Sequence, residues 1–188
     1  MNEKFDIYKM DDGSFFKENR LIFLYGEINA RTSYEVCTRL KYLDYLDSEK
    51  EIVLEINSPG GCVSSGLAII DTMNLINAPV KVLVCGMAAS MAALICACAT
   101  KGMRYALPHS TIMIHQPLGG ISMSQATDIA IYADNIVKTK KVLNELLATA
   151  TGQDIKQIEL DTERDNYFTS AEAKEYGLID HIVTKNNK

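Results

Sequence analysis

Short apolar runs alternate with longer segments of helical periodicity along most of this chain. Residues 21–25 and 51–57 have the composition of buried strands, and the segment between them, 29–48, carries apolar residues three to four positions apart. Parallel strands need a connection of a dozen or more residues, usually a helix. The alternation therefore predicts an α/β domain in which right-handed crossovers join parallel strands.

The same alternation continues to the C-terminus. Helices are predicted from the turn at 58–61 to about residue 77 and over 87–97, 122–151, 154–160 and 171–176, and strands over 80–85, 103–107, 110–116 and 181–183. Gly152 and Gly177 are expected to end helices as left-handed caps. Thr32 or Ser33 is expected to cap the helix over 29–48. The 188 residues fit a single domain, 1–188.

Composition and charge restrict the classes of function. With 47% hydrophobic and 23% charged residues, the chain is an ordinary globular protein. Its formal net charge of −5 and lack of basic clusters make nucleic-acid binding a poor expectation. We expect no secretory signal and no membrane span, because no apolar stretch follows Lys4 and no run of 18 uncharged apolar residues occurs.

The cysteines are odd in number and form no C-x-x-C pair. We interpret all five as buried thiols of a protein in a reducing cytosol. Cys96 and Cys98 could begin a metal site, but no His or third Cys is close in sequence, so no metal is expected. The five are Cys37, Cys62, Cys85, Cys96 and Cys98.

Two segments contain residues suited to nucleophilic chemistry. Ser90, in GMAASM at 86–91, lies at a predicted strand-to-helix turn, where unpaired N–H groups favour developing negative charge. The alternative is an ordinary N-cap serine. His115 ends the apolar run 111–114 and is better placed than His109 or His181 to face a cleft. The alternative is a core histidine bonded to a backbone carbonyl.

Two further segments could support such chemistry. A carboxylate from DTERD at 161–165 could orient a histidine, although a charge run is usually a solvated surface. The glycines of NSPGG at 57–61 could bring backbone N–H groups close to an oxyanion, or could simply form a tight turn and a helix cap. The sequence contains neither a phosphate-binding G-x-x-x-x-G-K-[ST] loop nor the G-x-S-x-G elbow of α/β-hydrolases.

Together these motifs resemble the Clp protease proteolytic subunit family, ClpP, over about residues 21–182. The motifs are INSPGG at 56–61, GMAASM at 86–91, MIHQPLGG at 113–120 and DTERD at 161–165, in the family's order. The resemblance implies a ClpP/crotonase-like layered fold of ββα units. It also implies a protruding handle helix at about 121–151 and an N-terminal axial segment at 1–20, which is divergent here.

The resemblance also implies the catalytic residues. The nucleophile falls on Ser90, the general base on His115 and the orienting carboxylate on Asp165, with Asp161 as the second choice. The implied oxyanion donors are the backbone N–H groups of Gly61 and Met91. The residues implied to pair with an extended substrate are Gly61, Cys62 and Val63 on one side and Pro117 and Leu118 on the other.

The family is a group of cytoplasmic serine endopeptidases that hydrolyse unfolded proteins to short peptides through an acyl-enzyme, without metal or cofactor. ATP is used only by a separate AAA+ unfoldase. Two stacked seven-membered rings enclose the active sites, and the resemblance places Arg164 in an ion pair across the contact between rings. The resemblance therefore implies a homomeric or mixed ring and unfolded polypeptide as substrate.

Several positions depart from the family pattern. Val53 and Glu55 occupy positions where many members have tyrosines that bind apolar unfoldase loops. A carboxylate there would cost desolvation free energy under such a loop, so unfoldase docking is not expected to follow the usual pattern. The segment 121–124 is one residue longer than usual. Two alternatives therefore stay open, namely an inactive structural subunit that supports an active paralogue, and a crotonase-like enzyme that acts on acyl-CoA.

Overall fold

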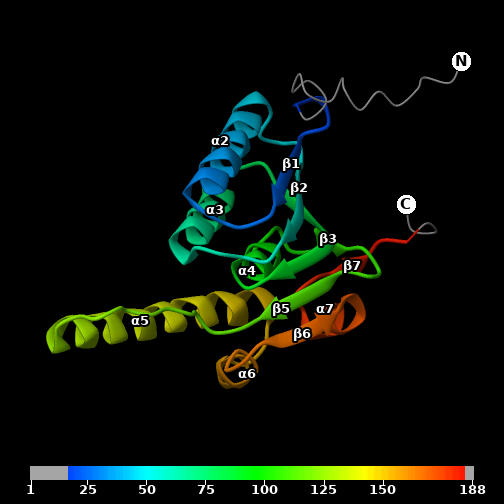
Figure 1. Cartoon of the computed structure of the whole chain (residues 1–188). Coiled ribbons are helices and arrows are strands. Elements are labelled where there is room, and N and C mark those ends of the chain that lie inside the picture. Colours follow the sequence, from blue (N-terminus) through cyan, green and yellow to red (C-terminus); the bar gives the residue numbers. More distant parts are fainter. Residues whose placement is uncertain (1–16, 185–188) are drawn as a thin grey trace, which may run out of the picture.

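One mixed sheet with helices packed against it forms the body of the protein (Figure 1). The computed structural model describes residues 17–184. Of the axial segment expected at 1–20, only 17–20 fall within these described residues. None of the helices within 17–184 is long and apolar enough to cross a membrane.

The sheet has seven strands, five of them in the order β1-β2-β3-β4-β7. The other two extend it from the C-terminal end of β3, where β5 pairs with β3 and β6 pairs with β5. All pairs are parallel except β5 with β6, which is antiparallel. The strands are β1 (Leu21–Tyr25), β2 (Ile52–Ser58), β3 (Val80–Ala89), β4 (Arg104–Ala106), β5 (Thr111–Ile114), β6 (Asn166–Thr169) and β7 (His181–Ile182).

The helices pack beside this sheet, and one of them leaves it. Figure 1 shows α2 and α3 side by side next to β1 and β2, α4 next to β3 and β5, and α5 extending away from the body. The helices are α2 (Ala30–Leu46), α3 (Val63–Leu75), α4 (Met91–Ala97), α5 (Ala126–Thr151), α6 (Ile155–Asp161) and α7 (Ser170–Tyr176). The predicted α/β class is confirmed.

The centre of the core lies where α4 meets β2 and β3. Every residue of α4 is buried, which explains why small side chains predominate in it, since a helix packed on all sides leaves little room. The strands beside it contribute fully buried aliphatic side chains, which close the core around the helix. These include Leu54, Ile56, Val82 and Val84.

The structure differs from the prediction at the start of α4 and at the cap of α2. Residues 87–89 are strand rather than helix, because Met87, Ala88 and Ala89 pair in parallel with β5. The N-cap of α2 is Asn29, whose side chain accepts from the N–H groups of its first turn, and Thr32 takes part in the cap through its hydroxyl, which accepts from the Asn29 N–H. Ser33 instead donates to a carbonyl of α3.

Local sequence signals predict some helix ends correctly but miss the start of α5 and one strand. Gly152 and Gly177 end α5 and α7 with φ of 82° and 95°, as predicted. The helix expected from residue 122 begins only at Ala126. Strand β6 was not predicted, because its identity depends on pairing with β5 rather than on its own short sequence.

A buried ion pair links the ends of several elements. Arg104 forms a two-pronged contact with Asp180, with Nη2 2.6 Å from Oδ1 and Nε 2.9 Å from Oδ2. Its Nη1 also donates to the carbonyls of Ala97 and Ala150, at the C-terminal ends of α4 and α5. The guanidinium therefore fixes the position of α5 relative to α4, the helix that follows Ser90.

Candidate active site

Ser90 connects β3 to α4 with an uncommon backbone. Its φ of 56° and ψ of −123° lie in a region that non-glycine residues rarely adopt, at a cost of about 1–3 kcal/mol. Its N–H donates to the carbonyl of Met113 at 2.8 Å. Its side chain makes no capping hydrogen bond to α4. The hydroxyl therefore does not act as an ordinary helix cap.

The hydroxyl of Ser90 instead faces the ring of His115. Ser90 Oγ lies 2.8 Å from His115 Nε2, and His115 Nδ1 lies 2.9 Å from Asp165 Oδ1. A histidine held by a backbone carbonyl in the core is thus not what the structure shows, since both ring nitrogens have side-chain partners. The three side chains form one continuous line of hydrogen bonds.

Sheet register brings the histidine and the aspartate together. His115 directly follows β5 and Asp165 directly precedes β6, and these antiparallel strands pair Ile114 with Asn166. The N–H of Gln116 donates to the carbonyl of Thr162, which closes the two loops against each other. Two residues 50 positions apart in sequence are therefore neighbours across a short ladder.

The second-choice carboxylate, Asp161, is engaged elsewhere. It accepts hydrogen bonds from the hydroxyl of Tyr176 at 2.7 Å and from the side chain of Gln157 at 2.9 Å. The geometry therefore favours Asp165 as the partner of His115. Of the other two histidines, His181 instead stacks on Tyr105, with ring centroids 4.9 Å apart.

A pocket of about 260 Å³ opens beside Ser90. Its apolar wall comes from α4, β5 and the C-terminal half of α5 and includes Leu94, Ile114, Leu143 and Leu147. The predicted site residues that line it are Gly61, Val63, Ser90, Met91, His115, Pro117 and Leu118. Most of the residues proposed from the motifs thus surround one cavity, whereas Cys62 is outside its lining.

The glycine turn passes directly over Ser90. A Cβ on Gly60 would lie 2.6 Å from the carbonyl oxygen of Ala89 and 2.8 Å from Ser90 Cβ, so a side chain there would clash. Gly61 has a φ of 147° and forms an isolated β-bridge with Ile28. The Ile28 N–H donates to the carbonyl of Gly60, and the Ile28 carbonyl accepts from the N–H of Cys62. The turn therefore carries Gly61 into the lining of the pocket, which Met91, the residue after Ser90, also lines. A Cβ on Gly60 would lie 3.1 Å from the Met91 nitrogen.

The segment 61–63 differs from the extended strand that the resemblance implied. Only Gly61 takes part in a β-bridge; Cys62 is the N-cap of α3, and Val63 is its first residue. Pro117 and Leu118, on the opposite side of the pocket, lie outside any helix or strand. An extended substrate would therefore find only a short edge on the glycine side.

Comparison with known proteins agrees with this geometry. Residues 3–186 match the family described as Clp protease. The chain is 52% identical over 184 residues to a protein of Ligilactobacillus salivarius (strain UCC118) described as ATP-dependent Clp protease proteolytic subunit, and the match covers 98% of this chain and 90% of the relative. This chain belongs to the Clp protease family. The predicted family and serine-peptidase function are thereby confirmed, and the acyl-CoA alternative loses its support.

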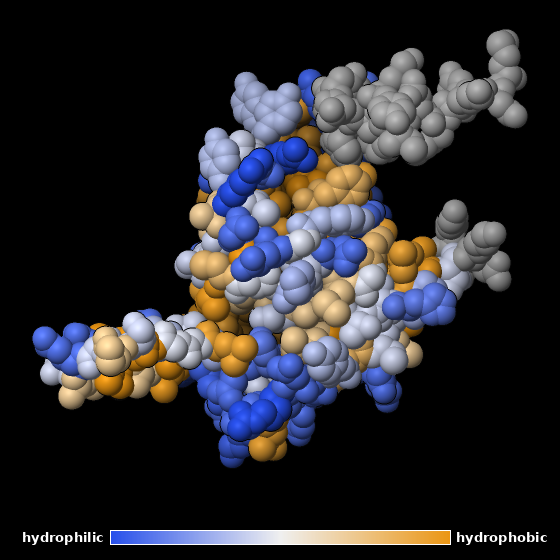
Figure 2. All heavy atoms as spheres, viewed as in Figure 1, coloured by the Kyte–Doolittle hydropathy of each residue, from blue (hydrophilic) through white to orange (hydrophobic). Residues whose placement is uncertain are grey.

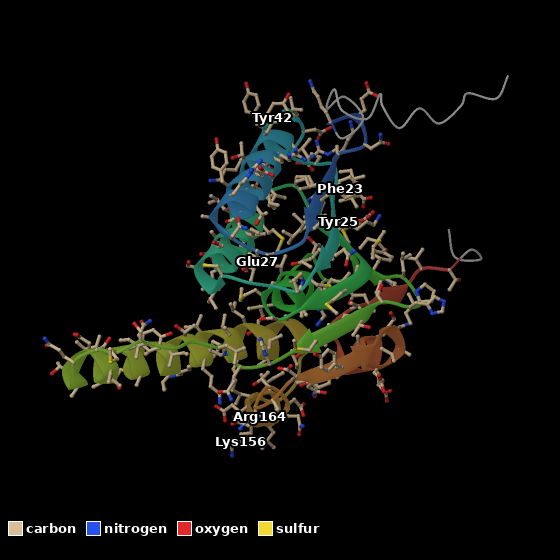
Figure 3. The ribbon with its side chains drawn as sticks, viewed as in Figure 1. Phe23, Tyr25, Glu27, Tyr42, Lys156 and Arg164 are labelled. Atoms are coloured by element: carbon tan, nitrogen blue, oxygen red, sulfur yellow. The ribbon has the colours of Figure 1, made fainter. Side chains whose placement is uncertain are left out.

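The unusual charge at Glu55 of this Clp protease chain has a local partner. Glu55 pairs with Phe23 across the parallel ladder, and its carboxylate accepts a hydrogen bond from the hydroxyl of Tyr25. That hydrogen bond raises the pKa of Tyr25 to about 12. Figure 3 shows Phe23 and Tyr25 together on β1, where their rings meet edge to face. The surface around Glu55 thus keeps aromatic character, while Val53 is opposite Leu21.

Arg164 lies on the surface, away from the pocket. Its side chain is 86% exposed, and its closest ionic partner is the neighbouring Glu163 at 3.7 Å. Figure 3 shows it near α6, the helix that ends three residues before it. Glu163 also binds Lys140 of α5 at 3.0 Å, a link between the loop before Asp165 and the long helix that sequence patterns did not reveal.

The thiols differ more than the sequence suggested. Of the five thiols expected to be buried, only Cys96 is; Cys37, Cys85 and Cys98 are half-buried, and Cys62 is exposed. Hydrogen bonds from Ser64 and Ser65 lower the pKa of Cys62 to about 7. Burial raises the pKa of Cys85 and Cys98 to about 11 and that of Cys96 to about 12. All five cysteines are free thiols. Within 17–184 no group of three potential ligands is arranged to hold a metal ion.

Iodoacetamide should therefore alkylate Cys62 before Cys85, Cys96 or Cys98. A lowered pKa means that about half of the Cys62 thiols are ionised near pH 7, and the thiolate is the reacting form. Peptide mass spectrometry after short exposures at several pH values should show a rate that rises most steeply around pH 7. Faster labelling of any of the three other thiols would contradict this assignment.

Proposed function

We propose that Ser90 is the nucleophile, His115 the general base and Asp165 the orienting carboxylate of this peptidase. The observation that carries the proposal is the line of hydrogen bonds from Ser90 Oγ through the imidazole to Asp165. In such an arrangement the carboxylate holds the imidazole in the tautomer that can accept a proton, and it stabilises the cation that forms. Asp161 has no such contact.

The chemistry would proceed through two acyl-transfer steps. Ser90 Oγ attacks the peptide carbonyl while His115 Nε2 takes its proton, and the imidazolium then protonates the leaving amine as the C–N bond breaks. Water, deprotonated by the same ring, attacks the ester, and Ser90 recovers its proton. The backbone N–H groups of Gly61 and Met91 would stabilise the tetrahedral oxyanion, with about 2.7–4 kcal/mol lost when such a donor is removed in comparable enzymes.

The proposed substrate is an unfolded polypeptide bound in an extended form. Its main chain would pair with the short edge at Gly61 on one side, next to Cys62 and Val63 at the start of α3, and with Pro117 and Leu118 on the other. Main-chain pairing is tolerant of sequence, so cleavage would be broad and would yield short peptides. The apolar wall of the pocket would contact the side chain of the substrate residue whose main-chain carbonyl is attacked. No metal or cofactor is required by these steps.

Replacing Asp165 with Asn should lower kcat for a fluorogenic peptide by roughly 10²- to 10⁴-fold. The amide would favour the wrong imidazole tautomer without changing the volume of the side chain. Stopped assays at saturating peptide measure the effect.

The matched control is Asp161→Asn, a carboxylate four residues away that binds Tyr176. It should change kcat by less than about twofold and cost about 1 kcal/mol of stability through the lost hydrogen bond. A large loss of kcat in Asp161→Asn with little loss in Asp165→Asn would refute the assignment.

We further propose that the chain works in the cytoplasm as a single peptidase domain within two stacked heptameric rings, fed by an ATP-driven unfoldase. The relative from Ligilactobacillus salivarius is described as the proteolytic subunit of an ATP-dependent protease. Free thiols suit a reducing compartment. Arg164 is free to reach an acidic group of another subunit. The complete hydrogen-bonded triad supports an active subunit over a purely structural one, in homomeric or mixed rings.

The long helix α5 supports assembly. Figure 2 shows hydrophobic residues along the arm that α5 forms, interspersed with polar ones. Ile129, Ile131 and Val137 are 47%, 63% and 66% exposed. Exposed apolar surface of this kind marks contact with another protein, here a second copy of the chain.

Replacing Ile131 with Glu should therefore reduce the mass of the assembly. A carboxylate buried at a subunit contact loses hydration without gaining a partner. Size-exclusion chromatography with light scattering measures the change, and Lys156→Glu on α6 serves as a control for added negative charge. An assembly of unchanged mass in Ile131→Glu would contradict the proposed role of α5.

A further inference from the structure

A second groove lies next to the candidate active site, between the start of α3 and the middle of α5. It has a volume of about 380 Å³. Val63 and Leu67 of α3 and Val142 of α5 form its apolar surface, and Asn135 and Lys138 add polar groups. Val63 also lines the pocket beside Ser90, so one side chain is shared by the two.

Lys138 is the one ionisable side chain that lines this groove. Its neighbours on α5 are neutralised, Lys140 by Glu163 at 3.0 Å and Lys141 by Glu145 at 3.8 Å. Lys138 takes part in no ion pair among residues 17–184 and is exposed. The groove therefore presents a positive charge that takes part in no ion pair among residues 17–184 above an apolar surface, with Asp134 one turn away on α5.

The groove and the pocket beside Ser90 are adjacent. Val63 lines both, and Val142 of the groove directly precedes Leu143 of the pocket on α5. Alternate side chains of an extended strand project from the same side about 6.8 Å apart. A peptide with one side chain in the pocket can thus place the side chain two positions away in the groove.

We propose that this groove is a substrate subsite for an acidic side chain two residues before the residue whose carbonyl is attacked, and that Lys138 determines this preference. The inference rests on the proposed function, because it assumes that the acyl-side residue fills the pocket beside Ser90. The methylenes of a glutamate would contact Val63, Leu67 and Val142. Its carboxylate would pair with the Lys138 ammonium.

The test compares two fluorogenic peptides that differ only at that position, one with Glu and one with Gln. The ratio of their kcat/KM values, Glu over Gln, should be about two to five at low salt, the size expected of an exposed ion pair. It should fall toward one in 1 M NaCl, because salt screens such pairs. Lys138→Met should bring the ratio to about one, and Lys138→Glu should bring it below one.

Lys141→Met is the matched control, since Lys141 is on the same helix but lines neither cavity. It should leave the ratio as in the unaltered protein. A ratio of one in the unaltered protein, or a ratio that survives Lys138→Met, would overturn the subsite.

A Ser90→Ala arm in the same assay separates this inference from the proposed function. If cleavage of the Gln peptide is lost in Ser90→Ala but the unaltered protein shows no preference, the subsite alone is wrong. If cleavage persists in Ser90→Ala, the assignment of the nucleophile fails, and the subsite, which rests on it, fails as well.

Discussion

The backbone of Ser90 is held in an uncommon conformation at the junction between β3 and α4, and the rest of the site depends on it. A strained residue persists only where its surroundings fix it. Here its N–H is bound to Met113 of β5, its neighbours on one side are paired strand, and its neighbours on the other are a fully buried helix. Gly60 closes over it without a side chain. The contacts that hold this backbone conformation therefore position the hydroxyl.

The other two members of the line are positioned by one short antiparallel ladder. Because β5 pairs with both β3 and β6, a single strand carries the constraint from Ser90 to His115 and on to Asp165. The buried Arg104 positions two helices relative to each other, since it donates hydrogen bonds to carbonyls at the ends of α4 and α5. The hydrogen-bonded line from Ser90 to Asp165 and the apolar wall of the pocket are thus both set by contacts between segments that are distant in sequence.

Local signals were sufficient for much of the fold. Strand β1 and the glycine caps of α5 and α7 follow from apolar patterning and from the left-handed conformation that glycine tolerates. The small or flexible side chains of residues 87–89 predict helix, as do those of the segment that follows. Their pairing with β5 overrides that preference. Strand β6 is four residues long, and only its long-range partner identifies it.

For the candidate site too, some features could be predicted from the sequence and others only from the structure. The family resemblance predicts Ser90, His115 and Asp165, although the acidic run by itself does not say which carboxylate meets the imidazole. The β5–β6 register brings Asp165 to the ring and leaves Asp161 to Tyr176. The sequence did not predict the hydrogen bond between Tyr25 and Glu55 or the groove around Lys138. Both arise where side chains from different elements meet, which periodicity does not encode.

The most direct measurement is to treat the assembled protein with a fluorophosphonate, which phosphonylates activated serine hydroxyls, and to locate the adduct by peptide mass spectrometry. We expect one adduct per chain, on Ser90, with none formed in Ser90→Ala. An adduct on a different residue, or labelling that persists in Ser90→Ala, would contradict it.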